Sequence, residues 1–570
     1  MYPPLFKGDL WEHVLKYHKN NLILILNADD LRKLGANISR SISWEKTALD
    51  CLWEIKHNPG LVQINDLPNV IIRFKNEGAI YYNGQSKRIG AKLYFNPAYV
   101  EGGSWDEKKL GTMRGTSLVF VSTIASELIS KAVNKKSNIL QKENVDVTIC
   151  EQIDRILMQG IKKGLISSLR FIKNGHGKND TENPIFFEEI CKTLFIDNKK
   201  EDYIVCTKVP KDDGTKPDLN PWSILGSKIK DIKLESLAIN IVKKGTSEIK
   251  EIPKGCFGKL TTVDRAEIES FRSIMKIMEE YINSDKTARP LSIAAFGYPG
   301  SGKSFGVTEV ARSIDREKVF KIDFNVSQFT SIKDLTNAFY RIRDISLEGK
   351  IPLVFFDEFD CKFGDQILGW LKYFLVPMQD GKFLDNGNLH PIGKSIFVFA
   401  EGVYKTYNDF CASMGLKYSS QTDFIEKETS INKGLIPEKC PDFVSRLRGY
   451  VNILGPNEID DDDEVYIIRR AIQLRSLIEE KIPHIIRTSN NNLNGNRKVA
   501  EVDIDEDILR ALIKIPRYIH GVRSMEAIID MSMFRGESSW QKSSLPSKDQ
   551  LQLHVNGTKF YQILAETRDD

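Results

Sequence analysis

A glycine-rich segment that ends in lysine and serine carries the most specific chemical signal in this chain. Gly297–Ser304 reads GYPGSGKS and fits the pattern G-x-x-x-x-G-K-[ST]. Glycines let the backbone fold around phosphate groups, so that amide N–H groups point inward. Lys303 can reach the β- and γ-phosphates, and the Ser304 hydroxyl can bind Mg²⁺. The residues expected to bind the nucleotide are Gly297, Pro299, Gly300, Ser301, Gly302, Lys303, Ser304 and Phe305.

Two carboxylates follow an apolar run further along the chain. Leu353–Asp360 reads LVFFDEFD, and ligands bind at the carboxyl ends of strands in a parallel sheet. We expect Asp357 to hold Mg²⁺ and Glu358 to act as the general base that polarises the attacking water. An acidic turn after a buried strand is common by itself. Because this one follows the glycine-rich loop, the two motifs together predict a nucleoside triphosphatase.

The elements that must position these groups are visible in the surrounding pattern. Leu291–Phe296 is an apolar run suited to a buried strand, and Phe305–Ile314 can continue the loop as a helix. The N-terminus of that helix adds a partial positive charge beside the phosphates. Upstream, Asp264 and Glu267 have the spacing of a capping box at the start of a further helix.

Residues 259–535, about half of the chain, resemble the AAA+ ATPase superfamily. Beyond the two phosphate motifs, Trp370–Asp385 followed by the strand Ile396–Ala400 is similar to the helix and Asp-Gly loop of Clp-type members. Gly434–Arg446 looks like the segment that ends in the arginine finger, and Gly521–Ser524 (GVRS) looks like the sensor 2 motif. The resemblance implies an α/β fold with a parallel-sheet P-loop core and a helical C-terminal lid. It also implies ATP and Mg²⁺ as ligands and hydrolysis of ATP to ADP and phosphate.

The resemblance gives the two arginines roles in catalysis. A planar guanidinium can stabilise the charge that builds up on the transferred phosphoryl group. In the family the finger reaches the nucleotide of the neighbouring subunit, so Arg446 implies a homo-oligomer, a hexameric ring or a related assembly. Arg448 lies close enough in the chain to be the finger instead. Arg523 would contact the γ-phosphate from the lid.

Two positions depart from the family pattern. The family places a small polar residue at sensor 1, directly after the strand Ile396–Ala400, and the nearest polar residue here is Glu401. Threading unfoldases of the family carry an aromatic-glycine pore loop, whereas Phe329 has no glycine beside it. Packing of Phe329 beneath a helix is the other interpretation.

The N-terminal part alternates strand-like and helical patterns, which predicts an α/β layer with a largely parallel sheet. It resembles in part the C-terminal half of ribokinase-like sugar kinases, on Asn27–Asp30 (NADD), Val70–Tyr82 and Gly111–Leu128. The last segment lacks the aspartate that serves that family as catalytic base. The resemblance therefore implies a degenerate, non-catalytic domain that recognises a protein partner or a small ligand, such as a nucleotide or another anion.

Composition restricts the class of protein. The chain has 570 residues, 41% of them hydrophobic and 28% charged, which is typical of soluble globular proteins. A net charge of +4 gives little support to nucleic-acid binding. No apolar run approaches the roughly 20 residues that a membrane span needs, and the N-terminus lacks the order of a signal peptide. The eight cysteines include no CxxC pair, so we expect a reducing, cytoplasmic location.

The sequence divides the chain into five parts. We expect an N-terminal domain over 1–170, a partly ordered connector over 171–258, the ATPase core over 259–455, a helical lid over 456–535 and a tail over 536–570. The leading hypothesis is an oligomeric ATPase that remodels a bound partner. The alternative is an ATP-dependent signalling or defence switch in which the N-terminal domain senses a ligand or partner. A nucleic-acid motor is the third hypothesis.

Overall fold

The chain forms two compact units in the computed structural model. One unit comprises Met1–Ser227 with Glu251–Lys254, and the other Lys228–Lys250 with Gly255–Asp570. The structure describes residues 6–85, 90–105, 111, 113–134, 147–174, 203–229, 233–284, 289–400, 403–413, 416–418, 425–427, 440–461, 463–490 and 498–566.

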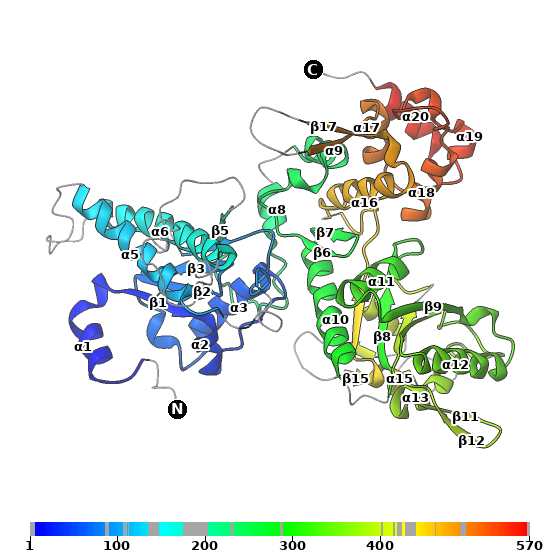
Figure 1. Ribbon diagram of the computed structural model, residues 1–570, viewed down its shortest axis with the longest axis horizontal. Coiled ribbons are helices and arrows are strands. Elements are labelled where there is room, and N and C mark those ends of the chain that lie inside the picture. The colour runs from blue at the N-terminus through cyan, green and yellow to red at the C-terminus, as the bar shows by residue number, and fades with distance from the viewer. Residues whose placement is uncertain are drawn as a thin grey trace, which may run out of the picture. The chain divides into compact units, whose positions relative to one another are not determined.

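A five-stranded sheet lies at the centre of the first unit (Figure 1). Its strands, in spatial order, are β1 (Ile23–Asn27), β2 (Asn69–Phe74), β3 (Gly78–Tyr82), β4 (Ala91–Phe95) and β5 (Val205–Val209). Only β1 and β2 run parallel, and the other three pairs are antiparallel. The prediction of a largely parallel sheet is therefore wrong. The connection between β2 and β3 is too short for the crossover that parallel strands require, so the chain turns back as a hairpin.

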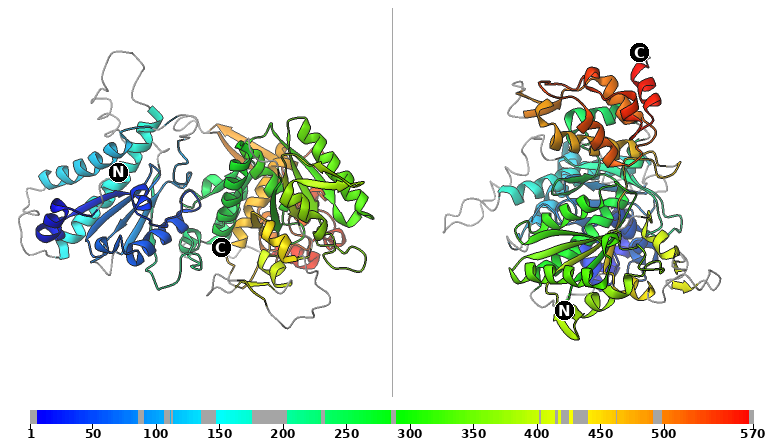
Figure 2. Two further views of the ribbon diagram at one scale, coloured as in Figure 1. Left: turned by 90° about the horizontal axis from the view of Figure 1, so that it is seen from below. Right: turned by 90° about the vertical axis from the view of Figure 1, so that its right-hand side faces the viewer.

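Helices cover both faces of this sheet. Alternate residues of β2 point to opposite sides, with Val70 and Ile72 in one core and Ile71 in the other. The first core includes α3 (Trp44–His57), whose Trp44 is buried and donates from Nε1 to the Tyr99 oxygen at 2.8 Å. The second includes α5 (Thr116–Asn134) and α6 (Val147–Asn174), which pack side by side (Figure 2). Shorter helices of the first unit are α1 (Asp9–His18) and α2 (Ala28–Lys33).

The segment 171–258, expected as a connector, contributes to both units instead. Strand β5 pairs with β4 in the first sheet. In the second unit α9 (Leu234–Lys244) packs against the C-terminal helices α16 (Tyr466–Lys481) and α17 (Glu506–Lys514). Along the chain, α8 (Ile224–Ile229) follows β5 and precedes α9. Strand β5 and helix α9 of this segment are thus built into the two units.

The second unit contains a parallel five-stranded sheet. In spatial order its strands are β16 (Gly449–Asn452), β8 (Leu291–Phe296), β13 (Ile396–Ala400), β10 (Ile351–Asp357) and β9 (Val319–Asn325). All four pairings are parallel, and they align Asp357 with Ala400 and Ala400 with Ala295 at the carboxyl ends. The loops that follow β8 and β10 therefore emerge at the same edge, which is where ligands bind such sheets.

Helices cover both faces of this sheet as well, and the residues of β10 alternate between the two cores. Leu353 and Phe355 pack towards α10 (Arg265–Asn283) and α11 (Lys303–Ile314). Val354 and Phe356 pack into an aromatic core on the opposite face. The helices of that face are α12 (Ile332–Leu347), α13 (Leu371–Asp380), α14 (Tyr407–Ser413) and α15 (Cys440–Arg446).

The C-terminal part of this unit is a helical layer that also contains a hairpin. Its helices are α16 (Tyr466–Lys481), α17 (Glu506–Lys514), α18 (Val522–Met531), α19 (Lys548–Leu551) and α20 (Gly557–Ala565). The hairpin pairs β17 (Ile486–Asn490) with β18 (Lys498–Val502). Because α20 packs against α17, the residues expected as a tail belong to the same layer.

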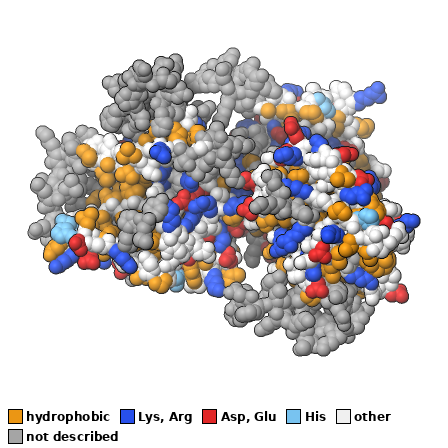
Figure 3. All heavy atoms as spheres, turned by 60° about the horizontal axis from the view of Figure 1, so that its bottom comes forward, with side chains coloured by type: hydrophobic (Ala, Val, Ile, Leu, Met, Phe, Trp, Pro, Cys, Tyr) orange, Lys and Arg blue, Asp and Glu red, His pale blue; other side chains and the backbone are white. Residues whose placement is uncertain are grey.

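The described part of the second unit also contains small hairpins: β6 (Gly255–Phe257) with β7 (Leu260–Thr262), β11 (Lys382–Asp385) with β12 (Asn388–Pro391), and β14 (Leu416–Tyr418) with β15 (Ile425–Lys427). Across the described ranges, no helix has the length and apolar character needed to cross a membrane. On the face drawn in Figure 3, acidic side chains are interspersed among the basic ones.

Candidate nucleotide-binding site

The glycine-rich loop connects the end of β8 to the start of α11, as its sequence predicts. Gly297, Gly300 and Gly302 have φ values of 149°, 75° and 92°. A Cβ atom at Gly300 would lie 2.1 Å from the His520 oxygen, so no other residue fits there without a shift of the backbone. Gly302 precedes α11 without a side-chain cap, which leaves the first N–H groups of the helix available to an anion.

Lys303 and the two serines of the motif, Ser301 and Ser304, line a cavity beside this loop. Lys303 Nζ donates to the backbone oxygens of Gly297 and Tyr298 at 2.9 and 3.3 Å, so its side chain lies over the loop. Ser304 lines the same cavity. Ser301 Oγ is buried and has no hydrogen-bond partner among the described residues. The loop thus presents a cation, a hydroxyl and free polar atoms, which suits a phosphate group.

Asp357 and Glu358 lie at the carboxyl end of β10 and line this cavity as well. Burial raises the pKa of Asp357, and the charge of Glu358 adds to this effect, whereas Lys303 and Arg523 oppose it. Glu358 has a φ of 53°, a conformation that costs a non-glycine residue roughly 1–2 kcal/mol. Backbone strain of this kind is concentrated at functional sites.

The cavity has a volume of about 530 Å³ and continues from the loop to the helical layer. This size suits a small-molecule ligand. On the side of the glycine-rich loop, the cavity wall consists of Pro299 to Gly306 with Asp357, Glu358 and Arg523. The rest of its wall includes the apolar side chains Leu260, Phe271, Ile453, Ile472 and Leu477.

Arg523 reaches the cavity because its helix is attached to the loop. The N–H of Val522, the first residue of α18, donates to the Gly300 oxygen at 2.9 Å. Gly521, with a φ of 58°, permits the close approach: a Cβ there would lie 3.0 Å from the same oxygen. The expected sensor 2 arginine therefore lies with the phosphate loop and the two carboxylates around one cavity.

Glu267 also lines this cavity, and here the expectation of a capping box is only half met. Asp264 caps α10 by accepting from the N–H groups of Ala266 and Glu267. The Glu267 carboxylate does not return to the Asp264 N–H. It accepts instead from Thr262 Oγ1 at 2.6 Å and from the Leu454 N–H at 2.8 Å. Burial and the nearby Asp264 raise its pKa to about 7.

The hydrogen bond from Leu454 joins Glu267 to the segment that connects the core to the helical layer, because Leu454 lies between β16 and α16 in the sequence. From α16, the buried Arg469 pairs with Asp463 at 2.5 Å and with Asp264 at 3.4 Å. The spacing of Asp264 and Glu267 could not predict these two contacts, because Leu454 and Arg469 are remote in sequence.

The two candidate finger arginines lie elsewhere on the second unit. Arg446 and Arg448 line a separate hollow of about 310 Å³, together with Arg289 and Asp442. Arg446 Nη1 donates to the Asp442 oxygen at 2.5 Å. Phe443, three residues earlier, is fully buried and anchors α15 against Phe399. The structure does not bring either arginine to the cavity of its own chain, and residues 434–439 of the expected motif lie outside the described part.

The other expected features of the core lie partly outside the described residues. Glu401, the sensor 1 candidate, is not among them. Phe329 is described, and its ring packs edge-on against Trp370 with centroids 5.7 Å apart. It is a partly buried member of the aromatic core, which favours the packing interpretation.

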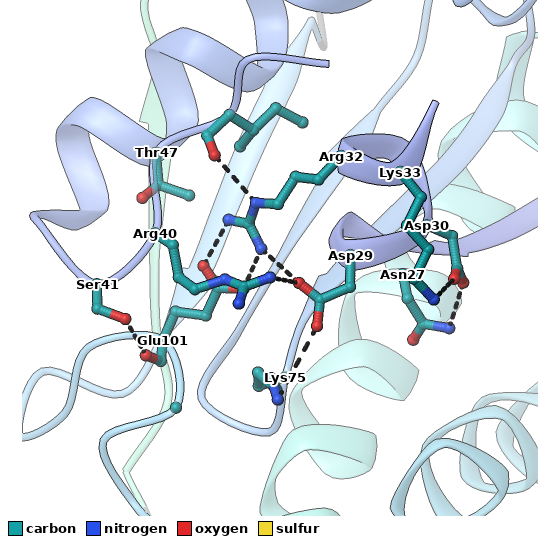
Figure 4. Close-up of polar contacts among 12 residues, drawn as sticks. Asn27, Asp29, Asp30, Arg32, Lys33, Arg40, Ser41, Thr47, Lys75 and Glu101 are labelled. Carbon is teal, nitrogen blue, oxygen red and sulfur yellow. Dashed lines mark hydrogen bonds and ion pairs between the residues drawn. The ribbon is translucent and has the colours of Figure 1, made fainter. Parts of the chain in front are cut away.

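In the first unit, the NADD segment forms an ion-pair network (Figure 4). Asp29 lies between Arg32, Arg40 and Lys75. Burial opposes its ionisation, but the hydrogen bond from Arg32 and the neighbouring positive charges lower its pKa. Arg32 also donates to both carboxylate oxygens of Glu101, at 2.6 and 2.7 Å. The charged groups of Asp29 and Arg32 are therefore paired with other residues of the first unit.

Comparisons with known proteins give weak similarities. No protein-family model and no curated protein matches the chain. Among solved structures it is similar to NtrX from Brucella abortus in complex with ADP, with 11% identity and a TM-score of 0.30 over 60% of this chain and 64% of that one. For the same protein in complex with ATP, identity is 11% and the TM-score 0.28, over 49% of this chain and 55% of that one. The chain spans less than two thirds of both structures, and at these scores the assignment of the site depends on its own residues.

Proposed function

We propose that the second unit is a Mg²⁺-dependent ATPase of the AAA+ type. The observation that carries the proposal is the single cavity that gathers the glycine-rich loop, Asp357, Glu358 and Arg523. The parallel sheet supports it, because the loops after β8 and β10 meet at one edge. A phosphate loop, two carboxylates and a lid arginine form the set of groups that phosphoryl transfer to water requires.

The residues present fit a magnesium ion. Ser304 and Asp357 offer a hydroxyl and a carboxylate oxygen on one cavity, and Mg²⁺ prefers oxygen ligands. When bound, the ion neutralises charge on the phosphate oxygens. Burial raises the pKa of Asp357, and the positive charges of Lys303 and Arg523 offset part of this effect.

Each remaining group has a role in hydrolysis. Glu358 accepts a proton from the water that attacks the γ-phosphorus. As the new P–O bond forms, the bond to the bridging oxygen breaks, and ADP and phosphate are the products. Lys303 and Arg523 stabilise the negative charge on the phosphoryl oxygens.

We also propose that the chain acts as a homo-oligomer, a hexameric ring or related assembly. Arg446 and Arg448 support this, because they lie in a hollow apart from the cavity of their own chain. From this hollow, an arginine that takes part in hydrolysis would act on the nucleotide of a neighbouring subunit. ATP turnover would then move the helical layer and remodel a partner held by the first unit.

A second candidate function is an ATP-dependent switch, in which ATP drives assembly and the first unit senses a ligand or partner. The packing of Phe329 against Trp370 favours it, because that aromatic is not free to grip a threaded chain. Stimulation of ATP hydrolysis by an unfolded protein would support remodelling. A size increase with ATP, without such stimulation, would support the switch.

The ATPase proposal is tested by Glu358→Gln. We expect this variant to bind ATP within about threefold of the wild type while turnover falls by roughly 10²–10⁴. Glu317→Gln, an isosteric change at an exposed residue away from the cavity, is the control and should change neither. Full turnover by Glu358→Gln would show that the active site is assigned wrongly.

A further inference from the structure

The wall of the nucleotide cavity contains a polar atom that the proposed hydrolysis does not use. Gln473 projects from α16 and lines the cavity. Its Nε2 donates to the Leu454 oxygen at 3.5 Å. Its Oε1 is buried and accepts no hydrogen bond from any residue that the structure describes. A buried acceptor without a partner is unfavourable, so its presence in a ligand cavity requires an explanation.

The Leu454 carbonyl determines which end of the Gln473 side chain is the free one. A carbonyl oxygen only accepts, so it must face the NH₂ group of the carboxamide, and Oε1 is left as the acceptor. The reverse orientation would set two oxygens against each other. The Leu454 N–H is already bound to Glu267 at 2.8 Å, which holds this backbone in place.

The surroundings of Gln473 suit a flat apolar group with a polar edge. Leu260, Phe271 and Ile472 line the cavity together with it, and apolar side chains of this kind can enclose a purine ring. Among the other polar side chains of the wall, Thr261 and Ser476 carry hydroxyls that both donate and accept. Glu267 already accepts from Thr262 and the Leu454 N–H, Glu526 pairs with Lys481, and Glu480 is exposed. The Gln473 oxygen is a buried acceptor of this wall that no described residue uses.

We propose that Gln473 selects nucleotides that carry a 6-aminopurine. The amino group at position 6 of adenine donates to Oε1, and the terminal torsion of glutamine is soft enough to bring the two atoms together. A 6-oxo purine would place a second acceptor against Oε1. The proposal rests on the proposed ATPase function and names the residue that selects its base.

The experiment measures the affinity of the full chain for ADP and for inosine diphosphate by calorimetry, because neither is hydrolysed. We expect the wild type to bind ADP at least tenfold more tightly, since a site built for one hydrogen-bond polarity rejects the other. Gln473→Met keeps the length but removes the acceptor, and the ratio should fall below about threefold. Gln473→Leu removes the acceptor in the same way and is a second variant, so that the test does not depend on the folding of one protein.

The control is Gln562→Met, at an exposed residue of α20, which should leave the ratio unchanged. An unchanged ratio in Gln473→Met, or a wild type with no preference, overturns the proposal while the ATPase function stands. If the wild type binds neither nucleotide, the proposed function fails with it. Thermal unfolding separates loss of the acceptor from loss of folding: a wild-type ratio in either variant that unfolds as the wild type does also overturns the proposal.

Discussion

The backbone N–H of Val522 donates to the Gly300 oxygen at 2.9 Å, so the helix that carries Arg523 is attached directly to the phosphate loop. Any change that displaces the loop must therefore move this arginine. A side chain at Gly300 would force the loop and the segment of His520 apart, because its Cβ would lie 2.1 Å from the His520 oxygen.

This contact predicts that Gly300→Ala impairs nucleotide binding. Its Cβ would lie 2.1 Å from the His520 oxygen, and we expect ADP affinity to fall at least tenfold, since helix and loop must separate. The matched control is Gly349→Ala, which has a similar φ of 80° but nothing within 4 Å of the added atom. Calorimetry with ADP should show near-normal binding for the control. Equal losses in both variants would attribute the effect to backbone strain instead.

Arg523→Ala should slow ATP turnover by roughly 10²–10³ with a smaller effect on ATP binding. The guanidinium stabilises charge that develops during the reaction, so its loss affects the rate more than the ground state. Steady-state hydrolysis at saturating ATP and separate binding measurements check this. Arg535→Ala, at an exposed residue outside the cavity wall, should behave as the wild type. A rate for Arg523→Ala within twofold of the wild type would contradict the role.

Glu267 predicts a pH dependence of stability. Its pKa is raised in the folded chain from an ordinary 4.5 to about 7. Between these values the folded state binds more protons than the unfolded state, so this group makes the free energy of unfolding decrease as pH rises from about 4.5 to about 7. The groups around the carboxylate are Asp264 on α10, Thr262 on β7, Leu454 and the Arg469 guanidinium.

Comparison with Glu267→Gln measures this effect, because glutamine does not titrate. Urea unfolding at pH 5 and pH 7.5 should show the wild type losing stability relative to Glu267→Gln at the higher pH. Glu280→Gln, on the exposed side of the same helix, should keep the pH dependence of the wild type. A difference between wild type and Glu267→Gln that stays constant with pH would rule out the effect.

The finger assignment predicts complementation between two inactive variants. Arg446→Ala should lower turnover by about 10³ or more. Mixed with Glu358→Gln, it should regain activity above the sum of the two, because an intact cavity then faces an intact arginine of its neighbour. The same experiment with Arg448→Ala is the comparison. Recovery only with Arg448→Ala would make Arg448 the finger, and no recovery with either would contradict an arginine supplied by a neighbour.

Local patterns in the sequence determined the elements of the parallel-sheet core in the second unit. Leu291–Phe296 and Ile396–Ala400 are strands with the predicted bounds, and the glycine-rich loop leads into α11. These predictions succeed because apolar runs, glycines and a helix start depend on neighbouring residues alone. The gathering of Lys303, Asp357 and Glu358 at one sheet edge also follows from the rule that parallel strands share their carboxyl ends.

Only the tertiary structure decided what depends on contacts between remote segments. The short turn after Phe74 makes the first sheet mainly antiparallel, and β5 joins it from a segment that reads as a connector. Glu267 has the spacing of a capping residue but accepts from Leu454, and Gln473 is one polar residue on a helix until the fold places it in the cavity. The roles of Glu267 and Gln473 depend on how segments that are far apart in the sequence pack together, because this packing fixes the hydrogen-bond partners of each side chain. The identity of each residue sets only what it is able to donate or accept.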